Sequence, residues 1–290
     1  MSHPASDASH DAEAAWGAHA PGPLVRAILG LTRAMPDNWP GRRAALALRR
    51  VAIRALRGAP VDVEALGARM RLYPYRNVCE KKVLFTPQYF DPGELAVLAA
   101  HVAQARARGE SFQFIDIGAN IGAYSVFVAA KAGPDARILA IEPQPDIFER
   151  LTFNIRQCPS PTVKAIACAV ADKSGELTLF LDPANSGESS LRVLPSGGAR
   201  SIRVPATPLL QLLQDEGFTR VNAMKLDVEG AEDIILEPFL REARDSLLPD
   251  LIVMEDGSSR WQVDLPSLVR ARGYRLKLRT RLNFVFERAG

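Results

Sequence analysis

The chain has 290 residues, of which 47% are hydrophobic and 24% charged, and this composition is typical of a folded globular protein. Its net charge of +3 is too small to indicate nucleic acid or an anionic membrane as the main partner of the whole chain. Three cysteines without metal-ligand spacing argue against a disulfide scaffold or a zinc site and favour a reducing, cytoplasmic location, and no apolar run is long enough to predict a transmembrane helix.

The first 70 residues divide into two segments. Residues 1–23 are poor in large apolar side chains and lack a signal-peptide pattern, which predicts a disordered tail. Residues 24–70 predict a helical extension. Four arginines of this extension share one helical face, and two apolar residues share another: Arg43, Arg50, Arg54 and Arg57, then Leu46 and Ile53. The arginines are either a solvated face of a helix that packs on the rest of the chain or a surface for an anionic partner.

From residue 71 to residue 290, short apolar strands alternate with helical segments. Strands are predicted at 112–117, 137–141, 163–170, 176–181, 221–227 and 251–255. Helices are predicted at 91–107, 119–131, 146–157, 208–216, 231–242 and 265–272, and a hairpin at 274–278 and 283–287. This alternation predicts parallel βαβ units with helices on both faces of one sheet. Such sheets bind ligands at the carboxyl ends of their strands.

The strongest local motif is Phe-Ile-Asp-Ile-Gly-Ala-Asn-Ile-Gly at 114–122, where a buried strand ends in a glycine turn that opens a helix. A dinucleotide site would need glycine at the second fingerprint position, but Asn120 stands there. Asp116 would also repel a pyrophosphate and attract a cationic ligand. The turn therefore favours S-adenosylmethionine, which has no phosphate and carries a sulfonium and an ammonium.

Two further motifs end in acids. Glu142 follows the next strand in Ile141-Glu142-Pro143 and can accept hydrogen bonds from both hydroxyls of a ribose. The segment 224–232, Met-Lys-Leu-Asp-Val-Glu-Gly-Ala-Glu, alternates Lys225, Asp227 and Glu229, which is unusual for a buried parallel strand. These three residues either form a ligand site or a structural ion pair, because buried charges need partners.

Together, these segments resemble the FkbM family of methyltransferases over roughly residues 80–255. The residues that carry the resemblance are Ile115–Gly122, Ile141–Pro143, Ala169–Asp172 and Lys225–Glu232. The resemblance implies an α/β, Rossmann-like class I fold with a mostly parallel seven-stranded sheet and an antiparallel C-terminal strand. It also implies methyl transfer from S-adenosylmethionine to a hydroxyl of a sugar, polysaccharide or natural product.

The resemblance also implies roles for individual residues. It implies that the cofactor is bound by Asp116, Gly118, Asn120, Gly122, Glu142 and Asp172. Asp227 and Glu229 would lie beside the transferred methyl and the acceptor, with Lys225 adjusting the local charge. The chain departs from the family at 206–210, Ala-Thr-Pro-Leu-Leu, where family members often carry a Leu-Asp pair, so no role is assigned there.

A hydroxyl acceptor must lose a proton, and histidine is the usual base. Three of the four histidines lie in the predicted tail, and His101 is interpreted as a surface or packing residue. The base is therefore expected to be Asp227 or Glu229. These two acids could also bind a hard cation, but no further ligand stands at clear spacing, so no metal is expected.

The sequence is also compatible with three alternative functions, each with less support. An NAD-dependent oxidoreductase lacks support because of Asn120, and a methyltransferase-like scaffold could bind a partner through the arginine-rich helix. A nucleic-acid methyltransferase is disfavoured because aromatics are only 7% of the chain. The expected partner is a small-molecule or glycan acceptor, and the sequence does not predict an oligomeric state.

Overall fold

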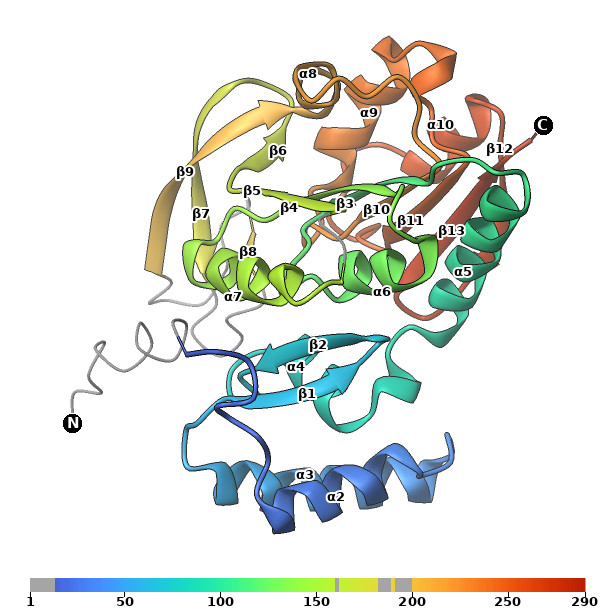
Figure 1. The fold of residues 1–290 in the computed structure, drawn as a ribbon. Coiled ribbons are helices and arrows are strands. Elements are labelled where there is room, and N and C mark those ends of the chain that lie inside the picture. Colours follow the sequence, from blue (N-terminus) through green and yellow to red (C-terminus); the bar gives the residue numbers. More distant parts are fainter. Residues whose placement is uncertain (1–13, 160–161, 182–188, 191–199, 290) are drawn as a thin grey trace.

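The central feature of the computed structural model is a seven-stranded sheet with the order β12-β13-β11-β10-β3-β4-β5 (Figure 1). The structure describes residues 14–159, 162–181, 189–190 and 200–289. The strands are β3 (Gln113–Ile117), β4 (Arg137–Ile141), β5 (Val163–Ile166), β10 (Ala223–Leu226), β11 (Leu251–Glu255), β12 (Tyr274–Arg279) and β13 (Asn283–Arg288). Neighbouring strands from β11 to β5 run parallel, whereas β13 is antiparallel to both β11 and β12. The predicted class I architecture and terminal hairpin are confirmed.

Helices cover both faces of this sheet. They are α5 (Pro92–Ala107), α6 (Ala123–Ala132), α7 (Pro145–Arg156), α8 (Leu209–Asp215), α9 (Glu232–Glu242) and α10 (Leu265–Ala271), with a short 3-10 turn η2 (Asp245–Leu247). Successive strand residues point to opposite faces, so Phe114 packs in the apolar cluster with α5 and α6, while Ile115 packs in the cluster with α8 and α9. This two-sided burial explains why the central strands are mainly apolar, with Asp116 in β3 and Lys225 in β10 as buried charged exceptions.

A second, smaller sheet lies beside the first. It has the order β6-β9-β7-β8 and consists of β6 (Ala169–Ala171), β7 (Gly175–Leu181), β8 (Ser189–Ser190) and β9 (Arg200–Pro208). The predicted single strand at 163–170 is therefore wrong, because β5 and β6 belong to different sheets. β9 was not predicted, because its internal proline, Pro205, argues against a strand.

The N-terminal region forms two layers below the main sheet in Figure 1. It comprises α2 (Pro23–Arg33), α3 (Trp39–Leu56), a hairpin of β1 (Val61–Ala65) and β2 (Ala68–Leu72), α4 (Val78–Phe85) and the 3-10 turn η1 (Pro87–Tyr89). The prediction of helices over 24–70 holds as far as residue 56 and is wrong beyond it. A two-residue turn with positive φ at Leu66 (54°) and Gly67 (82°) closes a hairpin instead. The division of the chain into domains stays a prediction.

The predicted tail is partly ordered. Residues 1–13 lie outside the described part of the chain, but residues 14–22 bind a buried ion pair of the hairpin. Asp62 and Arg71 pair at 2.7 Å, Asp62 accepts from the backbone of Gly17, and Arg71 donates to the carbonyl of Ala14. The prediction of disorder is therefore wrong for residues 14–22. The composition of a segment cannot show that its backbone binds charged side chains that lie 45 to 57 residues further along the chain. In the described part of the chain, every helix is too short or too polar to cross a bilayer.

Candidate active site

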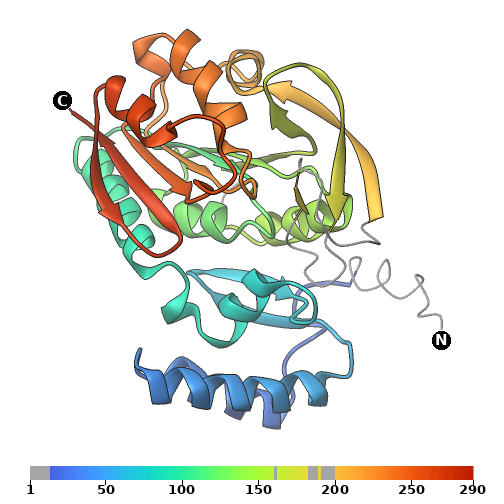
Figure 2. The same ribbon diagram turned by 180° about the vertical axis from the view of Figure 1, so that it is seen from behind.

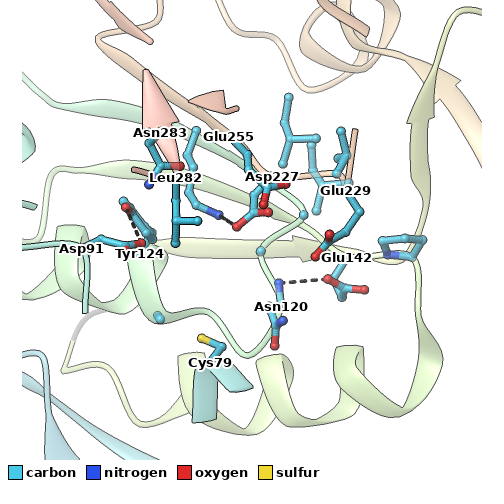
Figure 3. Close-up of a pocket in the computed structure, with 18 of the residues that line it drawn as sticks. Cys79, Asp91, Asn120, Tyr124, Glu142, Asp227, Glu229, Glu255, Leu282 and Asn283 are labelled. Carbon is cyan, nitrogen blue, oxygen red and sulfur yellow. Dashed lines mark hydrogen bonds and ion pairs between the residues drawn. The ribbon is translucent and has the colours of Figure 1, made fainter. Parts of the chain in front are cut away.

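A cavity of about 430 Å³ opens at the carboxyl ends of β3, β4, β10 and β11 (Figure 3). Its volume is in the range of small-molecule sites, and its position is where parallel α/β sheets bind ligands. Six of the predicted site residues line it: Gly118, Asn120, Glu142, Lys225, Asp227 and Glu229.

The turn after β3 is held against the tip of β10. Gly118, Asn120 and Gly122 all have positive φ, at 71°, 51° and 85°. A Cβ atom on Gly118 would overlap the backbone oxygen of Asp227 and lie 2.9 Å from its carbonyl carbon, so only glycine fits there. The turn occupies the residues predicted to start the helix, and α6 consequently begins at Ala123.

Glu142 connects this turn to the next strand. Its two carboxylate oxygens accept from the backbone N–H groups of Asn120 and Gln144, each at 2.9 Å. Burial raises the pKa of Glu142 to about 7. The carboxylate lines the cavity and retains lone pairs that can accept further hydrogen bonds from a ligand.

Lys225 and Asp227 form an ion pair at the tip of β10, with Nζ and Oδ2 2.9 Å apart. The Lys225 side chain is 7% exposed, whereas that of Asp227 is 39% exposed. Burial alone would lower the pKa of Lys225, but the carboxylates of Asp227 and Asp116 raise it above its usual value. Its ammonium also lies 4.8 Å from the ring centre of Tyr124. The pair is thus structural and lines the cavity as well, so the two interpretations of the motif are compatible.

A third acid, Glu255, completes a cluster with Asp227 and Glu229, and oxygens of the three lie within 4.8 Å of one another. Burial, followed by the charges of Asp227 and Glu229, raises the pKa of Glu255 to about 9. Glu255 was not among the predicted site residues, although it ends a strand predicted to lie in the same sheet. Such a cluster suits a positively charged ligand or a hard cation.

The loop after β10 is fixed by another acid of the same motif. Glu232 accepts through one oxygen from the backbone of Val228 and Gly230, both at 3.1 Å. Its other oxygen accepts from Nε1 of Trp261 at 2.7 Å. Glu232 does not line the cavity, and it holds the loop that carries Asp227 and Glu229.

The far end of the cavity is formed by residues that the sequence analysis did not identify. The Tyr124 hydroxyl donates to Asp91 at 3.1 Å, and burial raises the pKa of Asp91. Asn283 and Cys79 also line this region. Figure 3 shows the Asp91–Tyr124 pair at one end, Asn120 and Glu142 at the other, and Asp227 between them. No local pattern marked Asp91 beyond its position before a helix.

Three predicted cofactor residues are placed outside the cavity lining. Asp116 lies beneath the turn, where one oxygen accepts from the backbone N–H and hydroxyl of Ser125 at 3.1 and 2.6 Å. Gly122 is buried and packs near Leu151, while Asp172 is exposed after β6. His101, interpreted as a packing residue, contacts Glu287 at 3.1 Å away from the cavity. Asp116, Gly122 and Asp172 therefore lie outside the cavity lining, and their part in cofactor binding stays a prediction.

Comparison with known proteins identifies the family to which the chain belongs. The profile described as the methyltransferase FkbM domain matches residues 116–276, more than half of the chain. Methyltransferase sdnD of Sordaria araneosa is 30% identical over 154 residues, which cover 42% of this chain and 58% of that protein. Hexuronic acid methyltransferase AglP of Haloferax volcanii is 28% identical over 122 residues, 42% of this chain and 47% of that protein. The chain thus matches about half the length of these relatives.

Among solved structures, the METTL16 methyltransferase domain superposes with a TM-score of 0.47 at 14% identity, covering 91% of this chain and 89% of that one. The extent of the profile match decides the assignment, because it spans the glycine turn, the tip of β10 and the third acid on β11. The chain belongs to the FkbM family of methyltransferases, and its methyl donor is S-adenosylmethionine.

Proposed function

We propose that this methyltransferase transfers the methyl group to a hydroxyl of a sugar, polysaccharide or natural product. The observation that carries the proposal is the position of Asp227, a carboxylate between the two ends of one cavity. One end can hold the donor and the other the acceptor, so the reacting hydroxyl would meet a proton acceptor between them. Membership of a methyltransferase family sets the oxidoreductase alternative aside.

The residues at the Glu142 end fit the donor. Of the described side chains that line the cavity, five carry a carboxyl group and three a basic group: Asp91, Glu142, Asp227, Glu229 and Glu255 against Lys82, Lys225 and Arg281. This excess of carboxylates suits a ligand that is cationic and has no phosphate. Glu142 would accept from the ribose hydroxyls, while Gly118 and Asn120 would line the methionine end. When bound, S-adenosylmethionine supplies a methyl group already activated on a sulfonium.

The opposite end offers polar groups to an acceptor that bears hydroxyls. Asp91 and Tyr124 provide a carboxylate and a phenol that are already hydrogen-bonded to each other. Lys225 holds the Asp227 carboxylate in place, so Asp227 can orient the acceptor hydroxyl and take its proton. Glu229 can perform the same task from the adjacent loop, where Arg260 lies 3.9 Å from its carboxylate. The name of AglP, a hexuronic acid methyltransferase, supports a sugar as acceptor.

The experiment is mass spectrometry of sugar, polysaccharide and polyketide acceptors incubated with the enzyme and isotopically labelled S-adenosylmethionine. Label on oxygen supports the proposal, and label on nitrogen or carbon contradicts it. The variants Asp227→Asn and Glu229→Gln test the base. Loss of a general base lowers turnover by about 10²–10⁴-fold, while calorimetry should show cofactor binding intact. The matched control is Asp215→Asn, an exposed residue outside the cavity. If both variants keep full turnover, neither acid is the base.

A further inference from the structure

The low net charge of the chain conceals a strong asymmetry. Residues 23–57 comprise α2, α3 and the residues that link and follow them. They contain eight arginines and a single acid, Asp37, so this segment carries a formal charge of +7. Because the whole chain carries +3, the remaining residues together carry −4. A surface of one sign within a chain of nearly balanced charge indicates a local partner of opposite sign.

The same two helices expose large apolar side chains. Nine large hydrophobic residues of the described chain are exposed, and five of them lie here: Leu24, Leu31, Trp39, Leu46 and Val51. On α3, Trp39 and Leu46 are seven residues apart and are 70% and 43% exposed. On α2, Leu24 and Leu31 have the same spacing and are 55% and 57% exposed. Spacings of seven place both pairs in stripes along their helices.

Arginines alternate with these apolar residues on α3. The positions Trp39, Arg43, Leu46, Arg50 and Arg54 follow the three-to-four-residue repeat of one helical face, opposite the buried Ala45 and Ala52. The Arg43 guanidinium lies 4.9 Å from the centre of the Trp39 ring. Within the described part of the chain, no carboxylate lies within salt-bridge distance of Arg43, Arg50 or Arg54. Leu46, predicted to lie on a face apart from the arginines, is exposed beside them.

The helix pair is well separated from the active site. In both views of the ribbon, α2 and α3 form the layer farthest from the main sheet, with the β1–β2 hairpin between them and α6 and α7 (Figures 1 and 2). We call the outward side of this layer the α2–α3 surface and define it by Leu31, Trp39, Arg43, Leu46, Arg50 and Arg54. A ligand on this surface would leave the cavity open.

We propose that the α2–α3 surface docks the protein on an anionic phospholipid bilayer. Tryptophan and leucine insert at the level of the headgroups, and arginines beside them bind lipid phosphates. The arginines alone could also bind a nucleic acid, but binding to phosphates gives no reason for the exposed apolar side chains of Leu31, Trp39 and Leu46 on the same surface. A peripheral mode also agrees with helices that are too short or too polar to cross a bilayer in the described chain. The inference concerns location and is independent of the acceptor.

Vesicle co-sedimentation tests the proposal with the full chain. Vesicles of phosphatidylcholine alone are compared with vesicles of phosphatidylcholine and phosphatidylserine in equal parts. We expect binding to the mixed vesicles and its loss as ionic strength rises. Each arginine near an anionic surface strengthens binding roughly five-fold, so Arg50→Glu with Arg54→Glu should weaken it by about 25-fold or more. Trp39→Ser with Leu31→Ser should also weaken it.

The matched control is Arg244→Glu with Arg270→Glu, which changes the net charge equally. Both arginines are exposed and, within the described chain, have no carboxylate within salt-bridge distance. Arg244 follows α9 and Arg270 lies in α10, on the opposite side of the molecule from α2 and α3. This control should bind mixed vesicles like the parent. Melting temperature and cofactor affinity establish that each variant is folded.

Several results would overturn the proposal. One is a folded parent protein that does not bind the mixed vesicles, or a control pair that loses binding as much as the test pair. Another is binding to duplex DNA that the Trp39 and Leu31 substitutions leave unchanged, which would assign the surface to nucleic acid. A third is self-association that Trp39→Ser abolishes in a protein without vesicle binding, which would assign it to contacts between copies of the chain.

Discussion

Replacing Gly118 by alanine should destabilise the protein more than the same replacement in a glycine turn that has no close neighbour. Gly118 has a left-handed backbone with φ of 71°, and the added Cβ would overlap the backbone oxygen of Asp227. The backbone of residue 118 fixes the position of the Cβ, and the oxygen belongs to the backbone of Asp227, so no side-chain rotation can relieve the overlap. The tip of β10 must therefore move, and with it the carboxylate of Asp227.

The magnitude has two parts. Alanine with a left-handed backbone costs about 1 kcal/mol. A backbone overlap belongs at the upper end of overpacking penalties, at roughly 3 kcal/mol. The sum of about 4 kcal/mol is a large part of the free energy of unfolding of a typical protein. For a protein of this size, it should lower the melting temperature by about 8–16 °C.

Gly109→Ala is the matched control, because Gly109 has φ of 69° and a Cβ there would meet nothing within 4 Å. It should lose only the conformational part, a fall in melting temperature of about 2–4 °C. Calorimetric melting measures both variants, and methyl transfer is assayed below the transition. Gly118→Ala should lose turnover even where it is folded. Equal falls in melting temperature for the two variants would refute the close contact between the turn and β10.

Three further predictions concern the charged cluster. In the wild type, Glu255 has a pKa of about 9 and ionises as the pH rises from 7 to 9, so the preference for S-adenosylmethionine over its neutral demethylated product should increase over this range. In Glu255→Gln this preference should stay constant. Calorimetry measures both affinities, and a wild-type preference that does not change with pH would contradict the ionisation of Glu255. Lys225→Met leaves the buried Asp116 and the adjacent Asp227 without their cation and should cost about 3–5 kcal/mol of unfolding free energy, whereas an unchanged urea midpoint would mean that the pair is not structural. Treatment with EDTA should leave turnover unchanged, because Lys225 already supplies a positive charge to the cluster; a loss that Mg²⁺ restores would assign a cation to Asp227, Glu229 and Glu255.

The sequence predicted the parts of the site that follow one local rule. Acids and glycines at the carboxyl ends of parallel strands identified Gly118, Asn120, Glu142 and Asp227, all of which line the cavity. The same rule would have identified Glu255, which ends β11. Asp91 directly precedes α5 and Tyr124 lies in α6, and only the packing of α5 on α6 brings them together. No spacing in the sequence marks such a pair.

Asp116 shows how alternation along a strand limits that rule. Ile115 and Ile117 point to the face covered by α8 and α9, so Asp116 points to the other face, towards α6 and Ser125. Its oxygen Oδ2 is used at the start of α6 instead of at the cavity. The place of Asp116 before a glycine turn therefore identified the correct strand end. The direction of its side chain depends on the alternation of residues along the strand, and this alternation turns Asp116 away from the cavity.

The N-terminal errors have a different cause. The hairpin of β1 and β2 is stabilised by the buried pair of Asp62 and Arg71, which also binds the backbone of residues 14–19. Arg71 further donates its backbone N–H to Asn154 of α7 at 2.8 Å. Each of these contacts joins segments that are distant in sequence or differ in local pattern. Helical periodicity and composition describe single segments, and they cannot predict a structure that depends on one shared ion pair.

The register of the central strands links the fold to the electrostatics of the cavity. Lys225 is paired with Asp116 across β10 and β3, so the two side chains share one face, and the longer lysine also reaches Asp227. One buried cation thus balances two carboxylates, while Glu255 holds a proton at neutral pH. A cavity in this state gains free energy when a further positive charge enters, because Glu255 can then ionise. It should bind the cationic donor more tightly than the neutral product of transfer, and this difference favours exchange of product for fresh donor after each turnover.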